Sequence, residues 1–374
     1  MNEPATPTHP HVIQPVYQKL ALIVLGLVAF VYGLVQAQPI VVPLLFALLL
    51  ALLLNPLVNF LARRGLNRVV AIAIAVLLAM ACAAGLSYFI ITQAAHFSAS
   101  LPGLEEKVGA LGEKLETWVV SRTDLDTKTV DDALATAKKE SMTRGGALVG
   151  GALITMGSVF AFAFLLPVFT FLFLLYKRLL LTFIDQLFGP AELGAVHHML
   201  QGAKGVAQSY LIGLILQAGI VTVLNFVGLL IIGVPYALLL AVIAAVLNLI
   251  PYIGMIIATV LPMVIALATM EPGAALWVLA LYSAVQFIDN NFIVPNVVAS
   301  RVELNALVSI IVVMIGGALW GIPGMFLAIP LTAVLKVAFD HVPGLKPFGY
   351  VLGSDDGTPR KPSLHARWFG KKNR

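Results

Sequence analysis

LNLIPYIG (residues 247–254), QFIDNNFIVP (residues 286–295) and GGALWGIPG (residues 316–324) interrupt the apolar C-terminal half of the chain. Each places proline, glycine or amide side chains among residues that otherwise suit a lipid environment. In hydrocarbon, a backbone polar group without a hydrogen-bond partner costs several kcal/mol. Interrupted backbone therefore persists there only where protein buries it or where it lines a water-filled cavity. The interruptions predict a solute pathway through a membrane.

The composition is that of a polytopic membrane protein. Of 374 residues, 60% are hydrophobic and 11% are charged, and the mean hydropathy is +0.97. A soluble domain carries roughly 25% charged residues. The single cysteine, Cys82, allows no intramolecular disulfide and no thiolate metal site. The net charge of +5 gathers at the ends of apolar runs and in the C-terminal tail, which indicates membrane orientation rather than nucleic-acid binding.

The first 95 residues predict a disordered tail (residues 1–16) followed by the first membrane helices (residues 17–95). The apolar runs are Tyr17–Gln36, Ile40–Ala62 and Val69–Ala95. Arg63, Arg64 and Arg68 crowd the loop before the third run, and the positive-inside rule places that loop and the N-terminus in the cytoplasm. A cleaved secretory signal is the alternative for the first run. The sparse basic residues before it and the apolar runs directly after it favour a membrane helix.

Residues 96–145 predict a small extramembrane helical insertion. Nine acidic and seven basic residues fall within 97–145. Leu104, Val108, Leu111, Leu115 and Trp118 recur at spacings of four and three, which gives one apolar stripe on a helix. The insertion is too small to bury a core alone, so we expect it to pack on itself, on the membrane surface or on a neighbouring subunit.

Residues 146–340 form the expected transport core, and residues 341–374 a basic cytoplasmic tail. A fourth apolar run, Ala147–Tyr176, ends at Lys177-Arg178, and an amphipathic helix follows over residues 179–188. The fifth run, Gly205–Ile232, contains Gln208, Gln217 and Asn225.

Two later stretches, residues 235–270 and 304–339, are too long for one span. As a single helix, each would reach about 53 Å, whereas the hydrocarbon is about 30 Å thick. Each breaks near its middle, at residues 251–254 and 321–324. The stretches are either two kinked spans, for a total of eight, or two re-entrant hairpins beside six spans. Span length and the positive-inside rule favour hairpins, which place Glu271 outside and Arg301 inside. Kinks in ordinary spans remain the alternative.

The hairpin topology predicts an inverted repeat of helix plus broken hairpin, with the solute site at the repeat interface. Ser283, Gln286 and Asn290 share one helix face, and Asp289 borders it. An acid deep in an apolar run is costly and indicates a functional site, here one for a coupling proton or a cation. A structural aspartate paired with Arg301 is the open alternative. The predicted pathway residues are Asn248, Pro251, Tyr252, Gly254, Gln286, Asp289, Asn290, Asn291, Pro295, Arg301, Gly321, Pro323 and Gly324.

Four motifs carry a resemblance to a known family: ALLLNPLVNFLARRG (residues 51–65), GVPYALLLAVIAAVLNLIPYIG (233–254), DNNFIVP (289–295) and GGALWGIPGMFLAIPLTAVLKV (316–337). The chain resembles the autoinducer-2 exporter family of bacterial multi-pass proteins, from the first apolar run to about Val337. Ser300-Arg301 and Leu304-Asn305-Ala306 stand where members often carry Gly-Lys and Leu-His-Pro. Arg301 keeps the charge, while the histidine to which a proton role would be assigned is absent.

This resemblance implies a transporter in the bacterial cytoplasmic (inner) membrane. It implies export of autoinducer-2 or exchange of sodium or lithium for protons, and assembly as a homo-oligomer, with a pentamer expected. The expected partners are a small polar solute, a coupling proton or sodium ion and the lipid bilayer.

Three functions therefore stay open: a secondary transporter of a small polar solute, a cation–proton antiporter and a non-transporting membrane scaffold. No enzyme motif of the H-E-x-x-H or G-x-S-x-G kind occurs. We expect no catalytic residue, metal ligand or cofactor. No ATPase signature occurs either, so an ion gradient or the solute's own gradient would drive transport.

Overall fold

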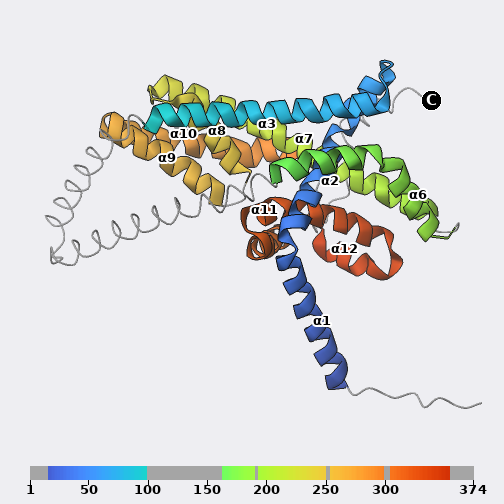
Figure 1. Cartoon of the computed structure of the whole chain (residues 1–374). Coiled ribbons are helices and arrows are strands. Elements are labelled where there is room, and N and C mark those ends of the chain that lie inside the picture. The colour runs from blue at the N-terminus through green and yellow to red at the C-terminus, as the bar shows by residue number, and fades with distance from the viewer. Residues whose placement is uncertain (1–15, 99–161, 190–192, 250–252, 299–303, 354–374) are drawn as a thin grey trace, which may run out of the picture.

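The computed structural model describes residues 16–98, 162–189, 193–249, 253–298 and 304–353, and these residues form helices and no strands. The helices are α1 (Val16–Gln36), α2 (Gln38–Arg63), α3 (Arg68–Ser98), an unlabelled helix (Phe162–Leu175), α6 (Lys177–Leu187), α7 (Leu193–Ile232), α8 (Ala237–Asn248), α9 (Ile253–Thr269), α10 (Pro272–Ile288), the π-helix η1 (Asp289–Val298), α11 (Ala306–His341), the short 3-10 helix η3 (Pro343–Leu345) and α12 (Lys346–Leu352). The predicted all-α polytopic bundle is confirmed (Figure 1).

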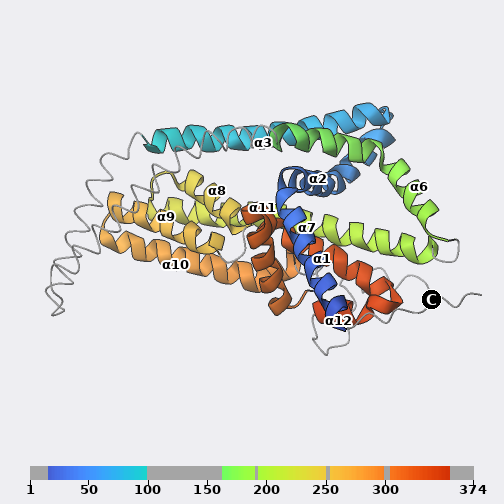
Figure 2. The same ribbon diagram turned by 60° about the horizontal axis from the view of Figure 1, so that its bottom comes forward.

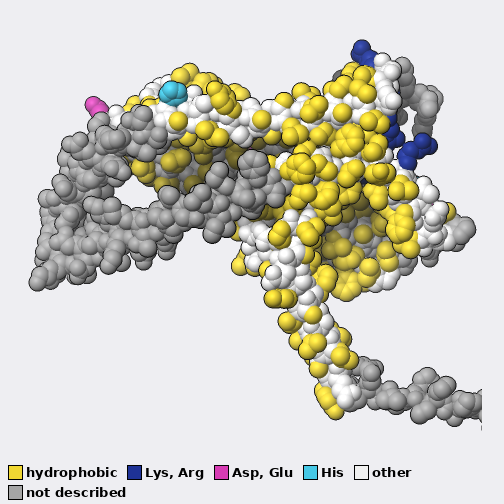
Figure 3. All heavy atoms as spheres, in the orientation of Figure 1, with side chains coloured by type: hydrophobic (Ala, Val, Ile, Leu, Met, Phe, Trp, Pro, Cys, Tyr) yellow, Lys and Arg dark blue, Asp and Glu magenta, His cyan; other side chains and the backbone are white. Residues whose placement is uncertain are grey.

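By length and composition alone, four of the described helices could cross a membrane: α2, α3, α7 and α11, of which α11 is interrupted at Trp320 and Gly321. Phe162–Leu175 and α6 add a fifth if the pair, bent by 62°, counts as one span. Hydrophobic side chains cover much of the face in Figure 3, while Lys and Arg gather at one end of it. Such an apolar surface suits lipid rather than water. The predicted insertion at residues 96–145, apart from its first three residues in α3, and most of the two tails lie outside the described residues.

Basic side chains converge where the Phe162–Leu175 helix bends into α6. Lys177 donates a hydrogen bond to Oδ1 of the buried Asn55 (3.1 Å), and Arg68 donates one to the Leu174 carbonyl (3.2 Å). Burial lowers the pKa of the Lys177 ammonium, and the nearby charges of Lys204 and Arg68 lower it further. These residues bring the two basic loops of the sequence, Arg63–Arg68 and Lys177-Arg178, to one end of the bundle.

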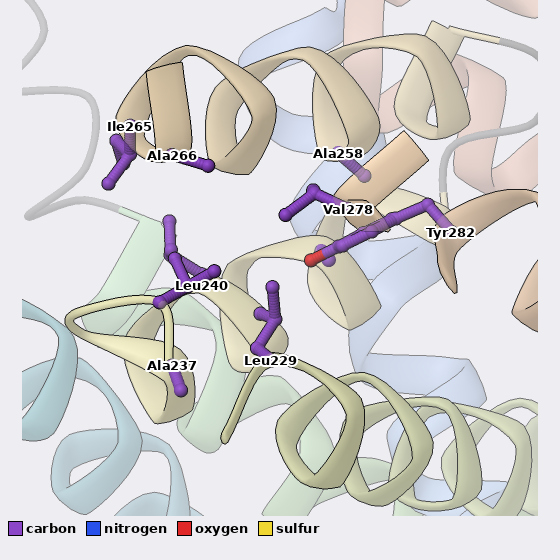
Figure 4. Close-up of a cluster of buried hydrophobic side chains, with 10 residues drawn as sticks. Leu229, Ala237, Leu240, Ala258, Ile265, Ala266, Val278 and Tyr282 are labelled. Carbon is purple, nitrogen blue, oxygen red and sulfur yellow. The ribbon is translucent and has the colours of Figure 1, made fainter. Parts of the chain in front are cut away.

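The first broken stretch is a helical hairpin. Helices α8 and α9 share one apolar core, in which Ala237 and Leu240 of α8 lie with Ala258 and Ile265 of α9 (Figure 4). At the narrow end of the hairpin, a Cβ on Gly254 would overlap the Leu247 carbonyl. Close approach of the two helix ends therefore depends on glycine at position 254. In a single kinked span, α8 and α9 would follow one another along the membrane normal and could not pack side by side. The contacts between them exclude that alternative.

The second broken stretch also folds back on itself. Helix α11 loses helical geometry at Trp320 and Gly321, and Gly321 has φ of 62°, which favours glycine. Gly316 and Gly324 are eight residues apart, yet their backbones are in contact. In a straight helix, residues at this spacing would lie about 12 Å apart. The two expected broken helical segments are thus both present, and both are reversals of the chain.

The narrow ends of the two hairpins meet beside η1. Leu249 at the end of α8, Val294 of η1 and Trp320 of α11 belong to one apolar cluster, which also contains Tyr210 and Leu211 of α7. Trp320 donates its indole N–H to the Leu34 carbonyl near the C-terminal end of α1 (3.0 Å). Figures 1 and 2 both show this end of α1 beside α11. The long α7 begins at Leu193, before the predicted Gly205, and packs against α8, α11 and η1. Helix α7 therefore lies next to both hairpins and next to the segment that carries Asp289.

Candidate functional site

The helix that carries the predicted polar motif changes its winding at Asp289. Helix α10 ends at Ile288, and the π-helix η1 runs from Asp289 to Val298. Pro295 has no N–H and removes a backbone hydrogen bond within this segment. Two asparagines bond to carbonyls one turn earlier: Asn291 to Phe287 (2.8 Å) and Asn296 to Phe292 (2.7 Å). Wide turns of this kind occur often at functional sites.

Asp289 is the centre of a buried hydrogen-bonded cluster. Its side chain is 1% exposed. The Gln217 amide nitrogen of α7 donates to Oδ1 (3.1 Å) and Oδ2 (2.9 Å), and the Asn248 amide nitrogen of α8 donates to Oδ2 (2.9 Å). Three helical segments far apart in the sequence thus converge on one carboxylate.

The cluster contains amide donors rather than a cation. Within the described ranges, no Lys or Arg forms a salt bridge with Asp289. The alternative partner Arg301 lies outside the described residues. Amide N–H groups satisfy the lone pairs of the carboxylate but leave its negative charge uncompensated. Such a group is well suited to bind a proton or a small cation, since either would neutralise a charge buried in an apolar bundle.

The other predicted residues of the motif point elsewhere. Asn290, Asn291 and Pro295 are exposed, and Gln286 donates a hydrogen bond to Asn290 Oδ1 (3.1 Å), as expected for residues on one helix face. Asp289 is instead buried toward α7 and α8. The structure therefore brings Asn248 to Asp289. Asn290, Asn291 and Pro295 are directed outward, and Gln286 is half-buried.

The residues at the two breaks differ in what they do. Gly254 and Gly324 are buried at close backbone contacts, Pro323 is half-buried and Gly321 is exposed at the reversal. Among described residues, no hydrogen bond joins the second break to Asp289. Pro251 and Tyr252 lie outside the described residues. The first break thus reaches the carboxylate through Asn248, while the second contributes apolar packing around η1.

Gln217 was not among the predicted site residues, although it donates to both oxygens of the carboxylate. Gln217 and Asn225 lie eight residues apart on α7 and are 7% and 2% exposed. A spacing of eight residues is slightly over two helical turns, so both amides lie on one face. Two amides on one face of an otherwise apolar run are the sequence signal that would have found them.

Comparison with known proteins gives this site a family context. The sequence profile described as "AI-2E family transporter" matches residues 21–344. "Putative transport protein MT0215" of Mycobacterium tuberculosis (strain CDC 1551 / Oshkosh) is 30% identical over 341 residues, which are 89% of this chain and 91% of that protein. "Putative permease PerM" of Escherichia coli (strain K12) is 26% identical over 223 residues, 59% of this chain and 63% of that protein. "Putative transport protein YrrI" of Bacillus subtilis (strain 168) is 36% identical over 132 residues, 35% of this chain and 37% of that protein.

Proposed function

The chain belongs to the AI-2E family of transporters, and on this premise we propose that it is a secondary transporter of a small polar solute. The solute would cross the bacterial cytoplasmic membrane through a route lined by the broken helices. The observation that carries this proposal is the buried Asp289, held by Gln217 and Asn248 where α7, α8 and η1 converge. An ionisable group buried in a membrane helix bundle is costly, and such a group is by default a candidate functional site.

The C-terminal end of α8 favours positive charge at the same place. Asn248 is the last residue of α8, and the carbonyl groups at a helix C-terminus carry a partial negative charge. This partial negative charge would add to that of the carboxylate. This arrangement supports a coupling proton or sodium ion at Asp289, and it makes a cation–proton antiporter the second candidate function.

Transport by reconstituted protein tests the proposal. We expect proteoliposomes to show protein-dependent uptake of ribose, used as a small polar probe and followed by osmotic swelling. We also expect an imposed pH or sodium gradient to change that uptake. Sodium-driven proton movement without ribose uptake would favour the antiporter. Vesicles that behave like protein-free liposomes in both assays would contradict transport and leave the membrane scaffold.

The orientation of the hairpins follows from the same proposal. With cytoplasmic termini, the loop between α9 and α10 at Glu271 faces outside, and the loop at Asn67 faces the cytoplasm. In a Cys82→Ser background, we expect a cysteine at Glu271 to react with a membrane-impermeant maleimide in spheroplasts. A cysteine at Asn67 should react only after the membrane is opened. The reverse labelling pattern would contradict this orientation.

We also propose a homo-oligomer. Helix α1 exposes large apolar side chains along its length, among them Leu20, Ile23 and Phe30, and it makes few contacts with the bundle. Its free faces are open to lipid or to a second copy. Mass measurement of the protein in native lipid discs separates an oligomer from a monomer.

A further inference from the structure

Two buried polar atoms next to the Asp289 cluster have no hydrogen-bond partner within the part of the chain that is described: Asn225 Oδ1 and the Tyr282 hydroxyl. Asn225 is 2% exposed and Tyr282 is 5% exposed. Figure 4 shows the Tyr282 side chain, from α10, within the apolar core formed by α7, α8 and α9. Buried polar groups in proteins are normally paired, so two unpaired atoms in one place indicate an occupant.

Both residues line the same small cavity. It lies between α7, α8, α9 and α10, and its volume of about 10 Å³ gives room for about one water molecule. Asn248, Thr259 and Gln286 complete its polar lining. None of the described side chains that line it is charged. An uncharged lining favours a neutral occupant, and the volume suits a single oxygen-centred group.

The hydrogen-bonding groups of the lining define that occupant further. Asn225 Oδ1 can only accept a hydrogen bond, and the Tyr282 hydroxyl can donate one and accept another. The other polar side chains of the lining each make a hydrogen bond elsewhere: Asn248 with Asp289 (2.9 Å), Thr259 with the Met255 carbonyl (2.9 Å) and Gln286 with Asn290 (3.1 Å). A group that donates to Asn225 and accepts from Tyr282 satisfies both atoms. A hydroxyl group does this, and an aliphatic group does not.

We propose that Asn225 and Tyr282 form a subsite for one hydroxyl group, supplied either by a water molecule or by an alcohol group of the solute. Asn248 lines the cavity and also bonds to Asp289. The occupant thus lies one amide side chain away from the carboxylate. The hydroxyl subsite itself does not depend on transport, whereas its occupation by a solute rests on the proposed function.

A double-mutant cycle on the purified protein tests the subsite. The variants are Tyr282→Phe, Asn225→Leu and the pair together, with thermal unfolding as the measurement. If a hydroxyl group bridges the two side chains, each single change removes a used hydrogen bond, and we expect each to lower Tm by about 2–4 °C. The double variant should lose less than the sum of the two, because both changes break the same bridge. Tyr210→Phe is the matched control, since Tyr210 is also buried but does not line the cavity.

An empty cavity predicts the opposite signs. Removal of an unpaired buried polar atom is neutral or stabilising. Single variants that keep or raise Tm, or losses that simply add, would therefore overturn the proposal. If the transport assay failed while the Tm losses of the two substitutions remained non-additive, only the proposed function would be overturned.

Ribose separates the two sources of the hydroxyl. If the solute supplies it, ribose should raise the Tm of the unmodified protein more than the Tm of the Tyr282→Phe variant. The shift seen in the variant measures the general stabilisation that sugars give to proteins. If water supplies the hydroxyl group, ribose should shift the Tm of both proteins equally, and the Tm losses of Tyr282→Phe and Asn225→Leu should remain non-additive.

Discussion

Asp289→Asn should reduce gradient-driven uptake about 10- to 150-fold, because a cation that loses an ionised partner forfeits about 1.5–3 kcal/mol. If the coupling ion is a proton, the same change removes the carboxylate that would bind it. Folding should survive, since Gln217 can turn its amide so that its oxygen accepts from the amide introduced at position 289. The measurement is ribose uptake under a pH or sodium gradient, with Tm and size-exclusion profile recorded on the same preparation.

Asp340→Asn is the matched control for this prediction. Asp340 is exposed and bonds to Lys336 on the same helix (2.7 Å), away from the buried cluster. Ion pairs of this kind contribute little to stability. Uptake should therefore stay within about twofold of that of the unmodified protein, which corresponds to a free-energy change of under about 1 kcal/mol. If Asp289→Asn transported as well as Asp340→Asn, the carboxylate would have no part in transport, and the membrane scaffold would become the better interpretation.

Gly324→Val should prevent the second hairpin from closing. A Cβ at this position would overlap the Gly316 carbonyl and lie 3.0 Å from the Trp320 Cβ. Overpacking of this kind costs about 1–3 kcal/mol. Both branches of the valine add bulk here, so we expect the upper end of that range and a Tm lower by about 6 °C or more. The measurement is Tm in detergent, together with the fraction of protein that elutes as a single species.

Gly219→Val is the control for the hairpin. Gly219 lies on α7, and nothing within 4 Å would meet an added Cβ there. Valine also favours a helix more than glycine does, so Tm should hold or rise. An unchanged Tm in Gly324→Val would mean that the two halves of α11 do not approach each other as described.

Local patterns were sufficient to predict the class of the protein and its broken segments. A membrane helix is predicted from a run of apolar residues long enough to cross the hydrocarbon layer. Such a run can be recognised without knowing which other helices pack against it. The two breaks follow in the same way from proline and glycine, whose effects on the backbone are local. Asp289 also stood out in the sequence as a candidate site residue, because an acid within an apolar run is conspicuous wherever the run packs.

The partners of Asp289 were not visible, because they come from other helices. Gln217 lies 72 residues away in sequence and Asn248 lies 41 away. The sequence placed Asp289 at the border of the face formed by Gln286 and Asn290, but helix periodicity does not say which neighbour covers which face. The sequence favoured a reversal over a kink in each long stretch but left the kink open. Contacts such as Gly254 against Leu247 and Gly316 against Gly324 decided it, since only packing brings backbones that close.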